Sequence, residues 1–131
     1  MSSFNFDHSA FQVSDMDAAI SWYMNTLGFE FLFRGTNEEE KEEYAFLKYG
    51  ESRLELIQDL VTPYEKPIIK KPFCPHVCLE VESMELALKI LKDHDLNIVR
   101  GPLEIAGEET WVYFADPDHN ILEFIQWYTK K

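Results

Sequence analysis

The spacing of hydrophobic residues changes along the chain in an order that occurs twice. In each half, an alternation of apolar and polar positions comes first, which is typical of a half-buried strand, and apolar positions at helical spacing follow it. Three more strand-like segments complete each half, so the pattern predicts strand-helix-strand-strand-strand twice. The expected strands lie near 5–13, 29–34, 44–49 and 52–59 in the first half, and near 75–82, 97–100, 109–115 and 120–127 in the second.

Each predicted helix has recognisable ends and one apolar face. Ser14, with Asp17 three residues later, is predicted to cap the first helix, Gly28 to end it, and Ser83 to cap the second. The expected core faces are Ala19, Ile20, Tyr23 and Leu27 in the first helix and Met84, Ala87, Leu88 and Leu91 in the second.

The two halves are related by a fixed offset. Residues 54–58 read Leu-Glu-Leu-Ile-Gln and residues 122–126 read Leu-Glu-Phe-Ile-Gln, so their glutamates are 123 − 55 = 68 positions apart. The same offset relates two strand histidines and two further pairs, namely His8 and His76, Ala19 and Ala87, and Phe46 and Phe114. Self-similarity of this kind indicates a duplicated unit.

Strand alternation assigns four chemically active side chains to the sheet faces that look away from the helices. Successive side chains of a strand point to opposite faces, and the purely apolar faces are expected to meet the helices. His8, Glu55, His76 and Glu123 then lie on the other, concave side of each sheet. The expected fold is therefore α+β, with two tandem βαβββ modules that form curved mixed sheets around a concave site.

Length and composition favour one globular domain. The chain has 131 residues, and we expect a single domain with a first module at about 5–59, a linker at about 60–74 and a second module at about 75–127. A formal net charge of −12 at pH 7 argues against nucleic acid and anionic membrane surfaces as partners. The sequence shows no signal peptide and no membrane-spanning run, and Cys74 and Cys78 are too far apart along a strand to form a disulfide. These features predict a reduced, cytoplasmic protein.

Two imidazoles and two carboxylates on one surface call for a cation. Like charges held close together do not both stay ionised without a positive partner. Two nitrogen and two oxygen donors suit a divalent first-row metal and leave positions for water or substrate. We therefore expect His8, Glu55, His76 and Glu123 to bind one divalent ion per site, with Ni²⁺, Co²⁺ or Zn²⁺ favoured over Mn²⁺.

The same residues carry a family resemblance. The segments S-W-Y-M-N-T-L-G-F at 21–29, L-E-L at 54–56 and D-P-D-H-N-I-L-E at 116–123, together with His8 and His76, resemble the vicinal oxygen chelate superfamily of glyoxalases, bleomycin resistance proteins and dioxygenases. The resemblance covers nearly the whole chain and is nearest to short bacterial-type glyoxalase I enzymes. Ring-cleaving members of the superfamily use three ligands in a longer chain, and bleomycin-binding members lack the metal.

The resemblance implies an activity and roles for the four residues. It implies a metal-dependent lyase or isomerase that moves a proton next to a metal-bound carbonyl, such as that of a 2-oxoaldehyde hemithioacetal. His8, Glu55, His76 and Glu123 would be the ligands, and Glu123 would also be the base. Glu55, the second catalytic candidate, would permit racemisation or epimerisation if it also moved a proton. The superfamily pairs its modules within one chain or between two, so we expect a homodimer.

The sequence departs from the lyase pattern at the positions that hold glutathione. Gln12 stands where the lyases have arginine, and Asp59 stands where they have asparagine. The loop at 103–109 lacks the usual lysine, and the cations expected nearest the site are Lys70, Lys71 and Arg100. Glutathione is therefore not predicted as the thiol, and the small-molecule substrate stays open.

Three readings remain at this point. The first is the glyoxalase-like enzyme, the second is another metalloenzyme of the same fold, an epimerase or thiol transferase, and the third is a metal-free protein that binds a planar ligand. Trp111 and Tyr113 fit either an aromatic wall around a substrate or ordinary core packing.

Overall fold

The two halves of the chain form two compact units of the predicted α+β type. The computed structural model describes residues 3–131, and the units are Met1–Glu65 and Lys66–Lys131. Their boundary falls inside the connection expected at about 60–74. Each unit contains one helix and a four-stranded mixed sheet, in the order strand-helix-strand-strand-strand.

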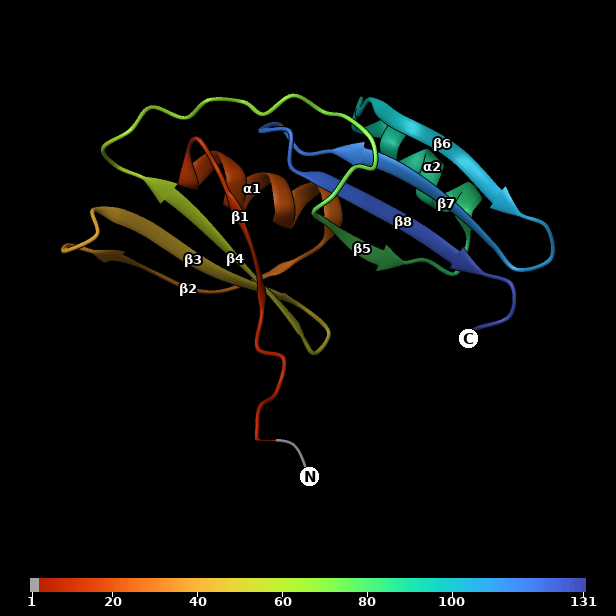
Figure 1. The fold of residues 1–131 in the computed structure, drawn as a ribbon, viewed down its shortest axis with the longest axis horizontal. Coiled ribbons are helices and arrows are strands. Elements are labelled where there is room, and N and C mark those ends of the chain that lie inside the picture. The colour runs from red at the N-terminus through yellow and green to blue at the C-terminus, as the bar shows by residue number, and fades with distance from the viewer. Residues whose placement is uncertain (1–2) are drawn as a thin grey trace. The chain divides into compact units, whose positions relative to one another are not determined.

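In the first module, the helix covers one face of the sheet. The elements are β1 (Ser9–Gln12), α1 (Met16–Leu27), β2 (Glu30–Asn37), β3 (Glu42–Tyr49) and β4 (Ser52–Asp59) (Figure 1). The strand order is β1-β4-β3-β2, with β1 parallel to β4 and the other pairs antiparallel. Helix α1 packs on β2, β3 and β4.

The second module repeats this arrangement. Its elements are β5 (His76–Glu80), α2 (Met84–Asp93), β6 (Ile98–Ile105), β7 (Glu109–Ala115) and β8 (Ile121–Trp127). The strand order is β5-β8-β7-β6, with β5 parallel to β8, and α2 packs on β8. Among residues 3–131, no helix has the length and apolar character needed to cross a membrane.

Strand pairing gives the exact relation between the modules. Ala10 pairs with Glu55 and Cys78 pairs with Glu123, so β1 and β4 correspond to β5 and β8 at the predicted offset of 68. On the neighbouring strands, Phe46 pairs with Glu55 and Tyr113 pairs with Glu123. The counterpart of Phe46 is therefore Tyr113, and the predicted match of Phe46 with Phe114 is wrong. The segment from Tyr113 to Glu123 has one residue more than the segment from Phe46 to Glu55, which shifts the offset to 67 there.

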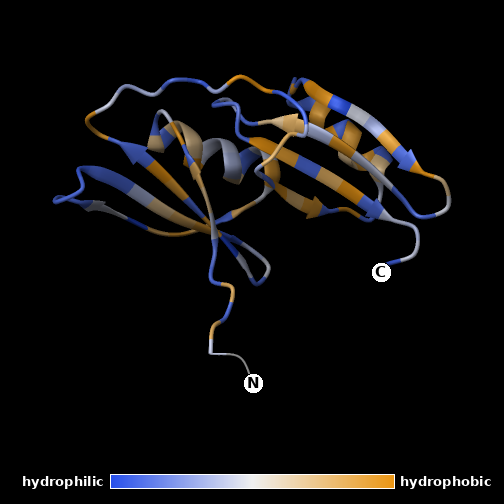
Figure 2. Cartoon of the chain, viewed as in Figure 1, coloured by the Kyte–Doolittle hydropathy of each residue, from blue (hydrophilic) through white to orange (hydrophobic). Residues whose placement is uncertain are grey.

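The apolar face of each sheet meets its helix, as the alternation predicts. Figure 2 shows the alternation as successive orange and blue bands along the strands. In each module, buried strand residues pack with buried residues of the helix. In the first module they are Phe11, Ala45, Leu47, Leu54 and Leu56 with Met16, Ala19 and Tyr23, joined by the buried Val13 just after β1. In the second they are Val112, Phe114, Leu122 and Phe124 with Met84, Ala87 and Leu91.

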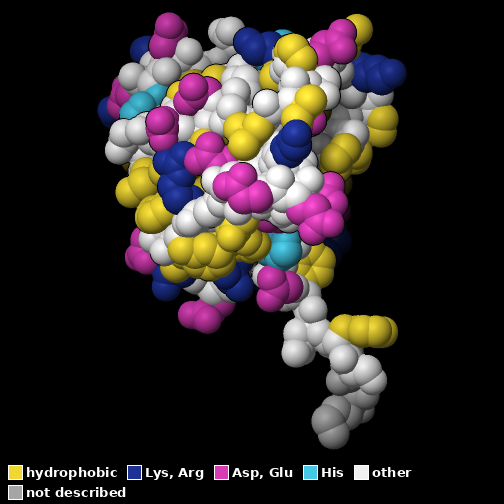
Figure 3. Space-filling model, turned by 90° about the vertical axis from the view of Figure 1, so that its left-hand side faces the viewer, with side chains coloured by type: hydrophobic (Ala, Val, Ile, Leu, Met, Phe, Trp, Pro, Cys, Tyr) yellow, Lys and Arg dark blue, Asp and Glu magenta, His cyan; other side chains and the backbone are white. Residues whose placement is uncertain are grey.

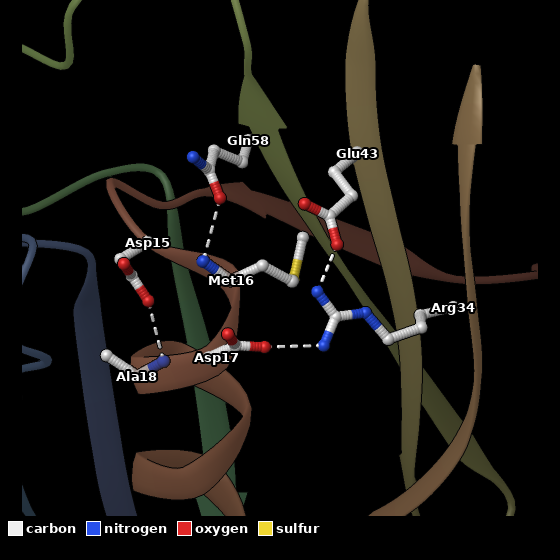
Figure 4. Close-up of polar contacts among 7 residues, drawn as sticks. All are labelled: Asp15, Met16, Asp17, Ala18, Arg34, Glu43 and Gln58. Atoms are coloured by element: carbon white, nitrogen blue, oxygen red, sulfur yellow. Dashed lines mark hydrogen bonds and ion pairs between the residues drawn. The ribbon is translucent and has the colours of Figure 1, made fainter. Parts of the chain in front are cut away.

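The first helix begins one residue later than the capping prediction requires. Asp15, rather than Ser14, is the N-cap, and its carboxylate accepts a hydrogen bond of 2.9 Å from the backbone N–H of Ala18 (Figure 4). The backbone N–H of Met16 donates to the Gln58 side chain of β4 at 2.8 Å. The Arg34 guanidinium binds both the Asp17 and Glu43 carboxylates, which ties the first turn of α1 to β2 and β3.

Other predicted ends agree with the structure. Gly28 ends α1 with a φ of 80°, in the left-handed region where glycine has no steric penalty. The Ser83 hydroxyl caps α2 by accepting from the backbone N–H of Leu86. Several strand ends differ from prediction: β1 begins only at Ser9, β2 continues to Asn37, β3 begins at Glu42 and β6 continues to Ile105.

Candidate functional site

The first module brings His8 and Glu55 together. His8 lies just before β1, and its Nε2 is 3.1 Å from Oε1 of Glu55 on β4. The Nδ1 atom of the same ring is 2.7 Å from a carboxylate oxygen of Asp7. This contact turns Nε2 toward Glu55. The hydrogen bond to His8 and the nearby Arg53 charge lower the pKa of Asp7, which keeps the carboxylate ionised.

The second module brings His76 and Glu123 together in the same way. His76 is the first residue of β5, and its Nε2 is 2.9 Å from Oε1 of Glu123 on β8. Its Nδ1 is 2.8 Å from the backbone carbonyl oxygen of Phe73. Glu123 is buried, with 8% of its surface exposed. A buried carboxylate needs a partner, and the His76 ring supplies one.

An aromatic ring supports each histidine from the strand on the far side of the glutamate strand. The His8 and Phe46 rings meet edge to face, with centroids 4.9 Å apart and planes at 75°. The His76 and Tyr113 rings meet at 5.4 Å and 75°. Since Phe46 and Tyr113 are the counterparts defined by strand pairing, the duplication extends to these supports. Tyr113 therefore belongs to the face that carries Glu123.

The negative charge of Glu123 affects two neighbours. Cys78 is exposed by surface area, yet enough protein surrounds its sulfur to raise the pKa of the thiol to about 12, and the Glu123 carboxylate adds to this effect. Partial burial and the same carboxylate raise the pKa of Tyr113. Both side chains therefore stay uncharged at neutral pH. Cys74 is also a free thiol, with its sulfur 3.9 Å from Nδ1 of His76.

The donor atoms fit a divalent ion in their chemistry and in their spacing. Two donors that bind one ion at about 2.1 Å and at a right angle lie about 3.0 Å apart. The separations of 3.1 Å and 2.9 Å in the two pairs are close to that value and are also those of a hydrogen-bonded imidazole and carboxylate. Within residues 3–131, neither module gathers three or more His, Cys, Asp or Glu side chains as a metal site, so each contributes one pair. The binding of one ion by all four residues stays a prediction.

Sequence reasoning missed Arg53 beside the first pair. The cations expected nearest the site were Lys70, Lys71 and Arg100, and Arg100 on β6 does lie opposite Tyr113, the residue that pairs with Glu123. However, Arg53 lies on β4 two residues before Glu55, with Nη1 3.8 Å from the Asp7 carboxylate that contacts His8. Period-two alternation places Arg53 on the face of Glu55, so the signal was present in the sequence.

The two positions that depart from the lyase pattern have different surroundings. Asp59 accepts hydrogen bonds from the backbone N–H groups of Val61 and Thr62, at 2.8 and 3.0 Å. These bonds lower the pKa of Asp59, which serves the turn after β4. Gln12 is the last residue of β1 and is exposed.

Comparisons with known proteins agree with the fold and with the motifs. The sequence model of the Glyoxalase/Bleomycin resistance protein/Dioxygenase superfamily matches residues 5–124. A probable lactoylglutathione lyase of Vibrio cholerae is 28% identical over 96% of this chain and 93% of its own length.

Two solved structures show the same fold. The trypanothione-dependent glyoxalase I of Leishmania major superposes with a TM-score of 0.77 at 24% identity, over 95% of this chain and 87% of its own. An antibiotic-binding protein from Streptomyces superposes with a TM-score of 0.72 at 17% identity, over 97% of this chain and 99% of its own. The fold is thus shared by enzymes and by binding proteins, and the site residues have to separate the two.

Proposed function

The chain belongs to the Glyoxalase/Bleomycin resistance protein/Dioxygenase superfamily, and from this membership we propose that it is a metal-dependent, glyoxalase-like lyase or isomerase. Its proposed substrate is a small molecule with a proton next to a carbonyl, such as a 2-oxoaldehyde hemithioacetal. The name of the 28% identical Vibrio cholerae relative, probable lactoylglutathione lyase, supports this reaction class.

The observation that carries the proposal is the duplicated, oriented histidine–glutamate pair. In both modules an oxygen atom holds Nδ1 of the histidine, and Nε2 faces a glutamate oxygen at about 3 Å. Metal-binding histidines have this arrangement, because the outer hydrogen bond fixes the ring and its tautomer. A protein that only binds a planar ligand has no need for two such pairs. This distinction favours an enzyme over a metal-free binding protein.

We assign His8, Glu55, His76 and Glu123 to one divalent ion, with Ni²⁺, Co²⁺ or Zn²⁺ as the favoured metals. Such an ion, when bound, polarises the substrate carbonyl and stabilises negative charge on its oxygen. Asp7 and the Phe73 carbonyl hold the histidine rings in place. The Phe46 and Tyr113 rings restrict the same imidazoles from the side.

Glu123 is assigned as the base. In a hemithioacetal the carboxylate takes the proton from the carbon that bears sulfur and returns it to the adjacent carbon, while the hydroxyl proton moves to the neighbouring oxygen. The substrate is isomerised to a 2-hydroxy thioester, and no oxidant or reductant is consumed. Glu123 suits this role because it is more buried than Glu55, with 10% against 18% of the side chain exposed. Its carboxylate is therefore better shielded from solvent than that of Glu55.

The test compares two conservative variants with a matched control. Glu123→Gln keeps an oxygen donor of the same shape but removes proton affinity, so turnover of a methylglyoxal hemithioacetal should fall at least about a hundredfold. Glu55→Gln should have a smaller effect, because Glu55 is chiefly a ligand. Glu51→Gln, on the exposed turn between β3 and β4, makes the same charge change outside the site and should behave as wild type.

Three measurements are needed on each variant: turnover, metal content by elemental analysis, and exchange of the carbon-bound proton with solvent deuterium. Wild-type turnover by Glu123→Gln with its metal retained would show that another group is the base. Protein that binds a 2-oxoaldehyde adduct tightly, holds no metal and never turns it over would instead be a binding protein.

A further inference from the structure

The open face of the first sheet carries two cations side by side. Arg53 on β4 pairs directly with Lys48 on β3, and directly opposed residues of an antiparallel pair share a face. Phe46 pairs with Glu55 one step further along, so this face also holds the first histidine–glutamate pair. Like charges directly opposite each other are unfavourable in a sheet. In a chain with a net charge of −12, such a pair needs an explanation.

Aromatic rings, rather than carboxylates, hold the Arg53 guanidinium. Its Cζ atom lies 4.8 Å from the Phe46 ring centroid and 5.8 Å from that of Phe33, and these two rings stack on each other. The Asp7 carboxylate is 3.8 Å from Nη1, beyond hydrogen-bond distance. Figure 3 shows hydrophobic side chains gathered beside a histidine and basic groups on the side of the molecule where β2 lies.

Most side-chain hydrogen-bond donors of these two cations form no hydrogen bond within residues 3–131. In this part of the chain, Arg53 forms no hydrogen bond to a carboxylate, and its buried Nε atom has no hydrogen-bond partner. The side chain is still 35% exposed. Lys48 has Glu30 as its ion-pair partner at 3.7 Å. A planar guanidinium fixed on two rings is already oriented for a planar anion from solution.

The second module lacks this feature at the corresponding positions. Strand pairing makes Ile121 and Ala115 the counterparts of Arg53 and Lys48, and these two residues pair with each other across β7 and β8. The duplication preserves the histidines, the glutamates and the supporting rings, but among the strands of residues 3–131 the directly opposed pair of cations occurs only in the first module, whereas the second places Arg100 on β6 opposite Tyr113. The opposed cations are therefore not part of what each module needs to hold its histidine–glutamate pair.

We propose that Arg53, with Lys48 beside it, is a carboxylate-binding subsite that selects acidic substrates. The inference rests on the proposed function and names its substrate class as a hemithioacetal with one carboxylate. The single negative charge of that group suits one guanidinium with a second cation nearby. The partly exposed ring of Phe33 adds a flat apolar surface for the adjoining part of the substrate.

The test varies the charge of the substrate at one end at a time, using the full chain loaded with Ni²⁺. One arm combines methylglyoxal with 3-mercaptopropanoate or with 3-mercaptopropanamide, which places the carboxylate on the thiol. The other combines 2-mercaptoethanol with 4-carboxyphenylglyoxal or with phenylglyoxal, which places it on the carbonyl part. In one arm, wild type should turn over the substrate with the carboxylate faster than the corresponding neutral substrate. That arm shows whether the carboxylate belongs to the thiol or to the 2-oxoaldehyde.

Arg53→Met should reduce the preference for the acid over the neutral substrate, measured as kcat/KM, about ten- to a hundredfold. This is the usual range for the loss of a hydrogen bond to a charged group, and the change should appear mainly in KM. Arg53→Lys should retain part of the preference, because it keeps the charge but loses the planar fork. Lys92→Met removes one positive charge from the exposed surface of α2 and should keep the wild-type preference. A merely structural role of Arg53 would lower the acid and the neutral substrate equally. That outcome would overturn the proposal, as would an unchanged preference.

A binding measurement separates this proposal from the proposed function. Calorimetric titration of 3-(benzylthio)propanoate and its amide needs no turnover. If no hemithioacetal is isomerised but the acid binds wild type more tightly than Arg53→Met, the subsite stands and the enzyme proposal fails. If hemithioacetals are isomerised and neither binding nor kcat/KM depends on Arg53, the subsite fails and the enzyme proposal stands.

Discussion

A glutamate in the middle of an apolar strand needs a partner, because an unpaired buried carboxylate costs several kcal/mol. Glu123 has this partner in His76, and the period of two along β5 and β8 was enough to place both side chains on one face. What alternation does not determine is how each ring is fixed. The two anchors, Asp7 and the Phe73 carbonyl, lie in irregular segments where no period sets the direction of a side chain or a carbonyl.

The Asp7 anchor gives a prediction at this scale. Asp7→Asn keeps an oxygen near Nδ1 of His8 but removes the negative charge that orients the ring. Metal affinity should fall at least about tenfold, the lower end of the range for lost outer partners of metal-binding histidines. Competition with a coloured chelator measures this, with Asp95→Asn, a surface change in the second module, as the control. Equal affinities of Asp7→Asn and wild type would show that Asp7 does not orient His8.

At the scale of elements, the sequence predicted every helix and strand but misplaced several ends. Asp15, not Ser14, caps α1, although the offset of 68 already aligned Asp15 with the correctly predicted cap Ser83. β6 continues through Gly101 and Pro102, which resemble a break in the sequence. Proline is tolerated there because β6 is the edge strand of its sheet and has register shifts on both sides of Arg100.

Each helix begins on a glutamine of the last strand of its module. The Gln58 side chain accepts from the backbone N–H of Met16, and the Gln126 side chain accepts from that of Met84, both at 2.8 Å. The repeated Leu-Glu-x-Ile-Gln segments contained both glutamines. Their role was hidden because it depends on a tertiary contact between strand and helix.

Replacing either glutamine should therefore loosen a helix start. Gln58→Leu or Gln126→Leu leaves a backbone N–H without its acceptor, and the free energy of unfolding should fall by about 1–2 kcal/mol. Gln58→Glu keeps the acceptor and places negative charge at a helix N-terminus, so it should stay near wild type. Urea unfolding followed by circular dichroism gives these values. Equal losses for the Leu and Glu variants would mean that packing, rather than the hydrogen bond, matters at this position.

At the scale of the whole molecule, duplication predicts two equivalent half-sites but not which two combine. A repeat fixes the contents of each module, whereas the pairing of modules depends on surfaces that no internal period describes. One such surface adjoins His8, because the preceding Phe4 and Phe6 are 83% and 89% exposed. Large apolar side chains that are so exposed beside a functional residue indicate a surface that a partner protein covers. We therefore propose a homodimer in which each site takes its first-module ligands from one chain and its second-module ligands from the other.

Complementation between two inactive variants tests this arrangement. His8→Ala removes a ligand from the first module and His76→Ala removes one from the second, so each variant alone should lose its metal and its turnover. After the two are unfolded, mixed in equal amounts and refolded, half of the dimers should contain one chain of each kind. If the sites are shared between chains, such a dimer contains one site with all four ligands and one site that lacks both histidines. About a quarter of all sites should then regain metal and turnover. Sites built within single chains would regain none, and light scattering of wild type at micromolar concentration supplies the control, since a stable monomer would contradict the shared site outright.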